Sequence, residues 1–436
     1  MKKNGFIMST YVYILLVFFL LLLGTMLVVL NNTRLLANKI KENTDGNIDF
    51  NLVLKGDKEI FIVKDSEYIE PGCIATTFDG EKLEVRVMGE VNAKKSGEYD
   101  IEYSAEYKGV EKKVKRKVIV GENLVTYITN LYEDSITRAS NNLKKDNTED
   151  KNIRYYGANP NNYVRFNNEL WRIIGIFGNN VKLIRNDRLG WLSWDTSEST
   201  VNNGYGINQW GESKDTSGNI YEGADLQVYL NKMYYGGIEV TCYNDLNNTK
   251  TTCPKDSNGN FLELDDVAKN LIDNHTWNIG AMRYISRTNT LTFYQAERGS
   301  VHGKSSCSSG NQCNDTIIRT TEWTGYVGLP YVTDWAYASS ESVCETNMAT
   351  QDSSNNYICK NNNWMQKSIL AWYLLPVTTS SGACYAWYVN KTGDPAGNYT
   401  YGLGGVIPAV YLKSDVFVTG GLGTSDNPYK LWLSEN

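Results

Sequence analysis

The feature that most constrains this chain is an uncharged apolar run near its N-terminus, from Tyr11 to Leu30. As a helix, a run of this length would span roughly 30 Å, the thickness of one hydrocarbon core. A cleaved signal peptide has a shorter run that ends at a small-residue cleavage site, and the following NNTRLLANKIKEN contains no such site. The sequence therefore predicts one transmembrane helix at 11–30, with a cytoplasmic end at 1–10 and a stalk at 31–50.

The remainder of the 436-residue chain has a globular composition and is long enough for two or three domains. Lysine and arginine lie on both sides of the apolar run, so the charges do not orient it. Seven of the eight cysteines lie beyond Cys73, several at hairpin spacing, which is typical of an oxidising exterior. We expect a single-pass protein of the cell membrane with its ectodomain outside.

Charge and aromatic content narrow the classes of partner. The net charge of −6 and the pI of about 5.3 argue against a nucleic-acid partner. Eleven tryptophans and thirty tyrosines suit interdigitating β cores, and an exposed minority of them would suit contacts with a glycan or a surface protein. The predicted partners are therefore a glycan or surface protein, and the membrane through one helix.

Residues 51–121 show the period-two alternation of half-buried strands. Apolar Tyr99, Ile101 and Tyr103 alternate with polar Asp100 and Glu102, and glycines separate such runs at turn spacing. The sequence predicts a small all-β sandwich here.

The same region resembles a bacterial Ig-like family named for its copies in pesticidal crystal proteins, through YIEPGCIATTFDG, MGEVN and KSGEYDIEY. The resemblance implies a spacer module on a surface protein. The N-terminal KKNGF in turn resembles a type IV prepilin leader, although Thr10 stands where type IV pilins usually carry glutamate. A pilin-like assembly subunit is therefore one alternative to a plain membrane anchor.

Residues 122–150 combine helical spacing with a polar, charged stretch and predict a helical linker. The segment 151–436 begins with strands at 163–166 and 170–177, joined by a turn at Asn167 and Asn168. Helices are expected at 224–235 and 264–272, followed by long loops and by strands at 385–390, 406–412 and 429–433. This order predicts an α+β domain whose two ends pair.

The segment 151–436 resembles a family of uncharacterised domains from Gram-positive bacteria with a C-type-lectin-like fold. The resemblance is carried by RYYGANPNNYVRFNNELWRIIGIF, GLPYVTDWAYA, SILAWYLLPV and GGVIPAVYLKSDVFVTGGLGTSDNPYKL. It implies a C-type-lectin-like α+β head, a fold shared by lectins, receptor-binding proteins and formylglycine-generating enzymes. Adhesion or recognition is the expected role, and an envelope enzyme on that fold is the other alternative.

Six cysteines form three pairs that are close in sequence: Cys242 with Cys253, Cys307 with Cys313, and Cys344 with Cys359. Zinc sites need CxxC-type spacing and histidine partners, so we expect disulfides and no metal. Pairing between different loops, such as Cys253 with Cys344, is the alternative. The remaining Cys73 and Cys384 lie in apolar strand contexts and are expected to be buried thiols.

Catalytic motifs are absent from the sequence. The chain has two histidines and neither HExxH nor GxSxG, and its glycine-rich segments lack a phosphate-loop lysine. A couple of His302 with Cys307 has no orienting acid, and Asp187, Asp195, Asp225 and Asp334 are interpreted as solvated loop carboxylates. We therefore expect no enzyme activity and no cofactor.

Tryptophans in glycine- and serine-rich segments remain as candidates for ligand binding, because a sugar can stack on an exposed indole. The alternative is that most of them pack against the domain. The candidates are Trp191, Trp194, Trp210, Trp323 and Trp335.

Overall fold

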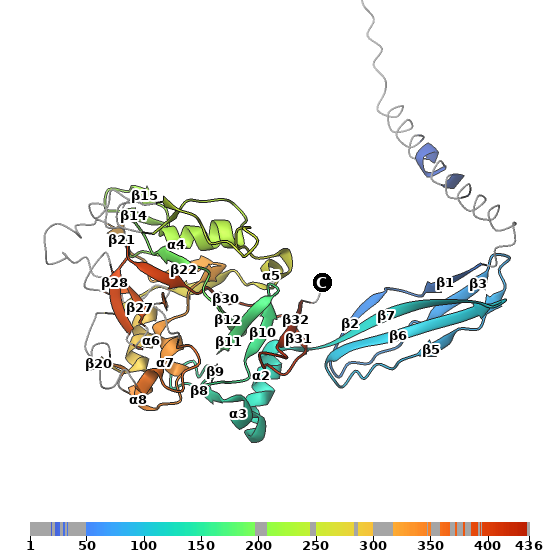
Figure 1. The fold of residues 1–436 in the computed structure, drawn as a ribbon, viewed down its shortest axis with the longest axis horizontal. Coiled ribbons are helices and arrows are strands. Elements are labelled where there is room, and N and C mark those ends of the chain that lie inside the picture. Colours follow the sequence, from blue (N-terminus) through green and yellow to red (C-terminus); the bar gives the residue numbers. More distant parts are fainter. Residues whose placement is uncertain are drawn as a thin grey trace, which may run out of the picture. The chain divides into compact units, whose positions relative to one another are not determined.

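The computed structural model in Figure 1 divides the chain into two compact units that separate near residue 120. It describes Phe19, Thr33, Gly393 and residues 22–26, 29–30, 49–196, 207–244, 250–282, 287–299, 317–346, 348–349, 358–366, 371–372, 378–379, 385–390 and 395–433.

The first unit has two small sheets. One has the order β1–β3–β4 and the other β2–β7–β6–β5. Their bounds are β1 Phe50–Leu54, β2 Glu59–Val63, β3 Cys73–Thr77, β4 Lys82–Leu83, β5 Arg86–Met88, β6 Gly97–Tyr107 and β7 Val110–Asn123. Along β6, buried Ile101, Tyr103 and Ala105 alternate with more exposed neighbours, which confirms the predicted period of two.

One residue breaks the expected pattern in the first unit. Arg116 shares the buried face of β7 with Val118 and is itself fully buried. Its guanidinium forms an ion pair with Glu70, and its Nε donates to the carbonyl oxygen of Asp57 at 2.9 Å. The buried charge is therefore paired, as a charge removed from water must be.

The second unit is built on a long mixed sheet with the order β23–β30–β12–β11–β10–β32–β31, with β9 and β8 beside β11. The last residues of β7 pair with β31. The bounds are β8 Leu143–Lys145, β9 Ile153–Tyr155, β10 Tyr163–Phe166, β11 Glu169–Phe177, β12 Asn180–Arg185, β23 Val327–Gly328, β30 Ala409–Tyr411, β31 Val416–Gly420 and β32 Tyr429–Leu433. Because β10 pairs with β32 in parallel, the two ends of this unit meet, as predicted.

A second sheet and several short ladders complete this unit. The sheet has the order β13–β29–β25–β27–β26–β19, with β28 beside β27. Its strands are β13 Trp191–Ser193, β19 Ala281–Met282, β25 Ala371–Trp372, β26 Thr378–Thr379, β27 Tyr385–Val389, β28 Pro395–Tyr399 and β29 Leu403–Val406. The short ladders are formed by β14 Ser213–Asp215, β15 Ile220–Tyr221, β16 Cys242–Tyr243, β17 Lys250–Thr251, β18 His275–Asn278, β20 Arg287–Thr288, β21 Ile317–Ile318, β22 Glu322–Gly325 and β24 Met348–Ala349.

The helices of the second unit are short. They are α2 Leu124–Glu133, α3 Ser135–Asn141, α4 Asp225–Val228, the π-helix η2 Tyr229–Tyr235, α5 Asp266–Leu271, α6 Thr290–Gly299, α7 Val332–Tyr337 and α8 Val343–Thr346. Buried Leu124 and Ile128 of α2 belong to the main core, together with Trp171 of β11. Residues 122–150, expected as a linker, thus lie within the second unit, where β8 pairs with β9.

Two parts of the predicted fold class are wrong. The chain is mostly β rather than α+β, because the loop-like segments form many short strands while the expected helices stay brief. Among the residues that the structure describes, no helix is long and apolar enough to cross a membrane. The single N-terminal transmembrane helix is therefore not supported, and most of 11–30 lies outside the described residues.

Candidate functional site

The five predicted ligand-binding tryptophans have very different surroundings. Trp191 is 39% exposed, and Trp323 is half-buried against the main core. The expected exposure is wrong for Trp194, Trp210 and Trp335, which are completely buried.

Mutual packing explains the buried tryptophans. The rings of Trp194 and Trp210 lie 4.9 Å apart, and Trp323 meets Trp210 edge-on at 6.1 Å. Trp335 lies in α7 and donates its Nε1 hydrogen to Oε1 of Gln366 at 3.0 Å. The small residues around the buried tryptophans therefore let the chain pack closely against large rings. The indole faces of Trp194, Trp210 and Trp335 are unavailable to a ligand.

Trp191 is the candidate that stays accessible, and it has a cationic neighbour. The guanidinium carbon of Arg188 lies 5.2 Å from the centre of its ring. Trp191 opens β13, where its cross-strand partner is Gly405 of β29. An indole face beside a guanidinium offers both an apolar surface and several hydrogen-bond donors.

Arg185 helps to fix the loop before Trp191. Nη1 of Arg185 donates to the carbonyl oxygens of Asp187 at 2.8 Å and Arg188 at 2.9 Å. Its Nε forms a 2.6 Å ion pair with Glu169 of the neighbouring strand. This loop therefore presents Arg188 and Trp191 from a rigid base.

A disulfide supports the same loop. Gly190 lies so close to Pro254 that an added Cβ would be 2.8 Å from its Cγ. Pro254 follows Cys253, which is bonded to Cys242 as predicted, with a Cα–Cα distance of 5.2 Å. The loop closed by this disulfide thus packs against the loop that carries Trp191.

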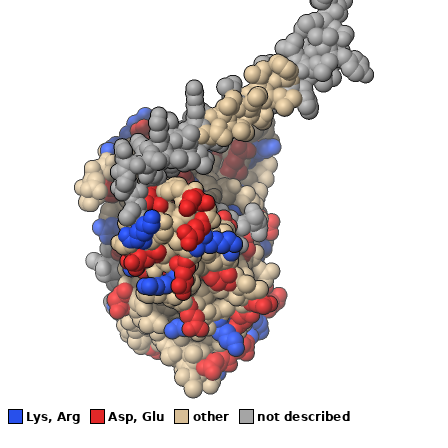
Figure 2. All heavy atoms as spheres, turned by 90° about the vertical axis from the view of Figure 1, so that its right-hand side faces the viewer, with Lys and Arg blue, Asp and Glu red and all other residues tan. Residues whose placement is uncertain are grey.

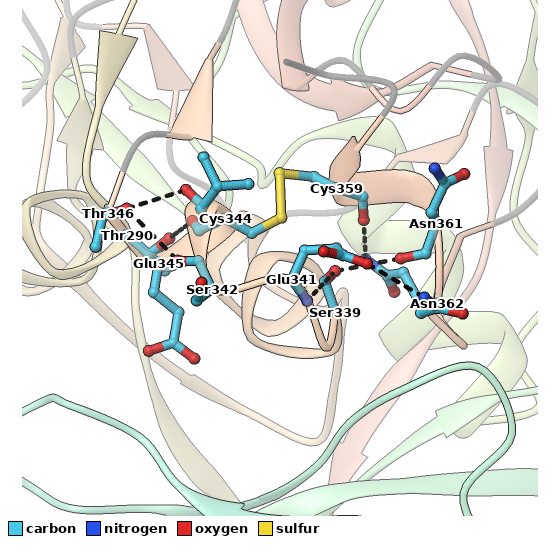
Figure 3. The surroundings of a disulfide bond; sticks show 12 residues. Thr290, Ser339, Glu341, Ser342, Cys344, Glu345, Thr346, Cys359, Asn361 and Asn362 are labelled. Carbon is cyan, nitrogen blue, oxygen red and sulfur yellow. Dashed lines mark hydrogen bonds between the residues drawn. A yellow bond between two sulfur atoms is a disulfide. The ribbon is translucent and has the colours of Figure 1, made fainter.

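The structure also contains the predicted bond between Cys344 and Cys359, with a Cα–Cα distance of 5.5 Å. Figure 3 shows that it links α8 to a short helical turn at 358–360, with Thr290 donating to the carbonyl oxygen of Cys344 at 2.6 Å. The alternative pairing of Cys253 with Cys344 does not occur.

The structure describes one of the four remaining cysteines. Cys307, Cys313 and Cys384, with His302, lie outside the described residues. Cys73 is a free thiol of intermediate exposure, and its partial burial raises its pKa.

A cluster of charged side chains is buried in the second unit, and no pattern in the sequence predicts it. Asp334 of α7 lies at its centre, accepting from Nζ of Lys182 at 2.6 Å and from Nη1 of Arg154 at 2.8 Å. Nε of Arg154 pairs with Asp146 at 2.6 Å. All four side chains are at most 1% exposed, so the interpretation of Asp334 as a solvated loop carboxylate is wrong.

Glu297 of α6 extends this buried charge cluster. It is fully buried and accepts from the hydroxyl of Thr333 at 2.9 Å and from Arg298 at 3.3 Å. Burial raises the pKa of Glu297 to about 7 and lowers the pKa of Lys182 to about 8. Burial also favours the neutral form of Asp334, but the charges of Lys182 and Arg154 outweigh it and hold the pKa of Asp334 below its ordinary value.

Two of the other aspartates that the sequence suggested were solvated differ in their burial. Asp187 lies in an exposed turn, whereas Asp195 is buried and accepts from the backbone N–H groups of Ile207 and Asp225. Burial, with the nearby charge of Asp225, raises the pKa of Asp195. Within the described residues, no group of three or more histidine, cysteine, aspartate or glutamate side chains is placed to hold a metal ion.

On the one face that Figure 2 shows, surface charge gives no further site among the described residues. Figure 2 shows basic and acidic side chains interspersed on the face turned to the viewer, without a continuous patch of one sign among the described residues. The accessible candidate is therefore the pair of Arg188 and Trp191, and the unusual chemistry lies in the buried charge cluster.

Part of the chain is similar to known proteins. The chain is 31% identical over 17% of its length to a lipoprotein from Bacteroides thetaiotaomicron of known crystal structure, covering 39% of that chain, with a TM-score of 0.16. No curated protein matches the chain significantly. The lectin-like resemblance of the second unit and the prepilin-like N-terminus stay predictions. Residues 52–120 match the family described as bacterial surface protein, Ig-like domain.

Proposed function

We propose that this chain is a bacterial surface protein whose second unit binds a glycan through Trp191 and Arg188. The match of residues 52–120 to an Ig-like domain of bacterial surface proteins supports the surface location. The observation that carries the ligand assignment is the 39% exposed indole beside a guanidinium on a rigid loop. The first unit then acts as a spacer.

The two side chains suit a glycan that carries carboxylate groups. The apolar face of a sugar ring packs on an indole, and a planar guanidinium donates two parallel hydrogen bonds to a carboxylate. Stacking and hydrogen bonding are binding interactions, and neither side chain is a nucleophile or general base at neutral pH. The proposed role is therefore adhesion or recognition rather than catalysis.

An array of neutral and acidic glycans probed with the full chain and with a Trp191→Ala variant tests this proposal. Loss of the central aromatic contact should cost about 2 kcal/mol, roughly a 30-fold loss of affinity. Arg188→Gln should weaken the acidic glycans more than the neutral ones.

Ile220→Ala is the matched control, because Ile220 is an apolar residue of the same unit that is 62% exposed. This variant should bind like the original protein. Glycan binding that Trp191→Ala leaves unchanged, or a ligand that proves to be a protein without glycan, would contradict the proposal.

A further inference from the structure

The contact between Lys182 and Asp334 is unusual because an amine and a carboxyl group meet in complete burial. Nζ of Lys182 lies 2.6 Å from Oδ2 of Asp334, and neither side chain is exposed at all. The amine lies 3.9 Å from the centre of the Tyr331 ring and just over 5 Å from those of Trp277 and Tyr411. An amine and a carboxyl group are thus within hydrogen-bonding distance, and aromatic rings surround the amine.

The carboxyl group is also polarised from other directions. Arg154 donates to Oδ1 of Asp334 at 2.8 Å, and the backbone N–H of Tyr331 donates to Oδ2 at 2.9 Å. Donors in such positions stabilise the negative charge that develops on a carboxyl oxygen when a nucleophile attacks its carbon.

We propose that Lys182 and Asp334 join through an intramolecular amide bond between Nζ and the side-chain carboxyl carbon. A proton first passes from the ammonium of Lys182 to Oδ2, leaving a neutral amine beside a neutral acid. The lone pair of Nζ then attacks the carboxyl carbon, the bond from that carbon to Oδ2 breaks, and a second amine proton leaves with this oxygen. The products are one amide and one water molecule, so no further reactant is required.

Two properties of the site favour this condensation over a permanent ion pair. Fixed reacting groups behave as if present at effective concentrations of roughly 10⁵ M or more. Burial also disfavours the charged form of Lys182, and its pKa, lowered to about 8, brings the neutral amine within reach at physiological pH. The bond would join β12, within the long sheet, to α7, which is 152 residues away in the sequence.

Peptide mapping of the full-length protein tests the bond without any substitution. After reduction and trypsin digestion, the bond should yield peptide 173–185, uncleaved at Lys182, joined to peptide 320–360 with the loss of one water. Separate peptides 173–182 and 320–360 at their sequence masses, with no joined species, would overturn the proposal.

An internal control comes from the partly exposed pair of Lys144 and Glu345, which is also within hydrogen-bonding distance. Peptide 139–144, which ends at Lys144, should appear at its sequence mass, because no amide forms at this lysine. A Lys182→Met variant, measured intact after denaturation and reduction, should lack the one-water deficit of the original protein. If both proteins show the same agreement with their sequence masses, the amide does not form.

Discussion

Glu297 should make the stability of the second unit depend on pH between about 4.5 and 7. Burial raises its pKa from 4.5 to about 7, so in this range the folded state holds a proton that the unfolded state has released. The stabilisation is complete below pH 4.5 and is lost as the pH rises through 7. The difference between the two pKa values corresponds to about 3 kcal/mol.

Replacing Glu297 with glutamine removes this titration and preserves the shape of the side chain. The amide oxygen still accepts from Thr333, which lies 2.9 Å away in the original protein. Relative to the original protein, Glu297→Gln should therefore gain about 3 kcal/mol of unfolding free energy between pH 4.5 and 7.5.

Denaturant unfolding followed by tryptophan fluorescence measures the second unit alone, because all eleven tryptophans lie at or beyond Trp171. Comparison with the variant is necessary because His275 acts in the opposite direction. Burial lowers the pKa of His275 below 6.5, so its contribution to stability grows with pH in part of the same range. Parallel pH profiles for the two proteins would refute the reasoning.

Three further predictions use the same protein. Replacing Cys242 and Cys253 with serine should weaken glycan binding at Trp191 severalfold, while the melting of the second unit, followed by fluorescence, changes less. A variant that unfolds but whose folded fraction still binds glycan normally would contradict this. Arg116→Met should destabilise the first unit by about 3 kcal/mol, because Glu70 and the carbonyl oxygen of Asp57 lose their cationic partner. Hydrogen exchange of residues 50–119 measures this change, and unchanged protection would argue against it. Gly421→Ala should cost more than about 1 kcal/mol by thermal unfolding, because φ is +96° and an added Cβ would lie 2.2 Å from the carbonyl oxygen of Pro428; an unchanged melting temperature would rule out this strain.

Features with local causes could be predicted from the sequence. The hairpin at 163–177 forms with Asn167 and Asn168 at φ of 54° and 56°, because asparagine tolerates the left-handed region that the turn requires. The disulfides of Cys242 and Cys344 follow similarly from partners 11 and 15 residues away.

Features with distant causes could not be predicted. Asp334 meets Arg154 and Lys182 from positions 180 and 152 residues away, and no local pattern marks those partners. Arg116 faces inward along β7, where a charged residue usually indicates the solvent side of a strand. Glycine-rich surroundings likewise indicate an exposed loop, whereas at Trp210 they accompany a core residue.

The parallel pairing of β10 with β32 determines when the second unit can be completed during synthesis. Val164 lies opposite Tyr429, so the middle of the long sheet can form only after Tyr429 has left the ribosome. Until then the edges of β10 and β31 carry unsatisfied backbone groups that other strands can bind. A chain truncated before Tyr429 should consequently be a target for quality-control proteases, even though it retains Trp191, the disulfides and the buried charge cluster.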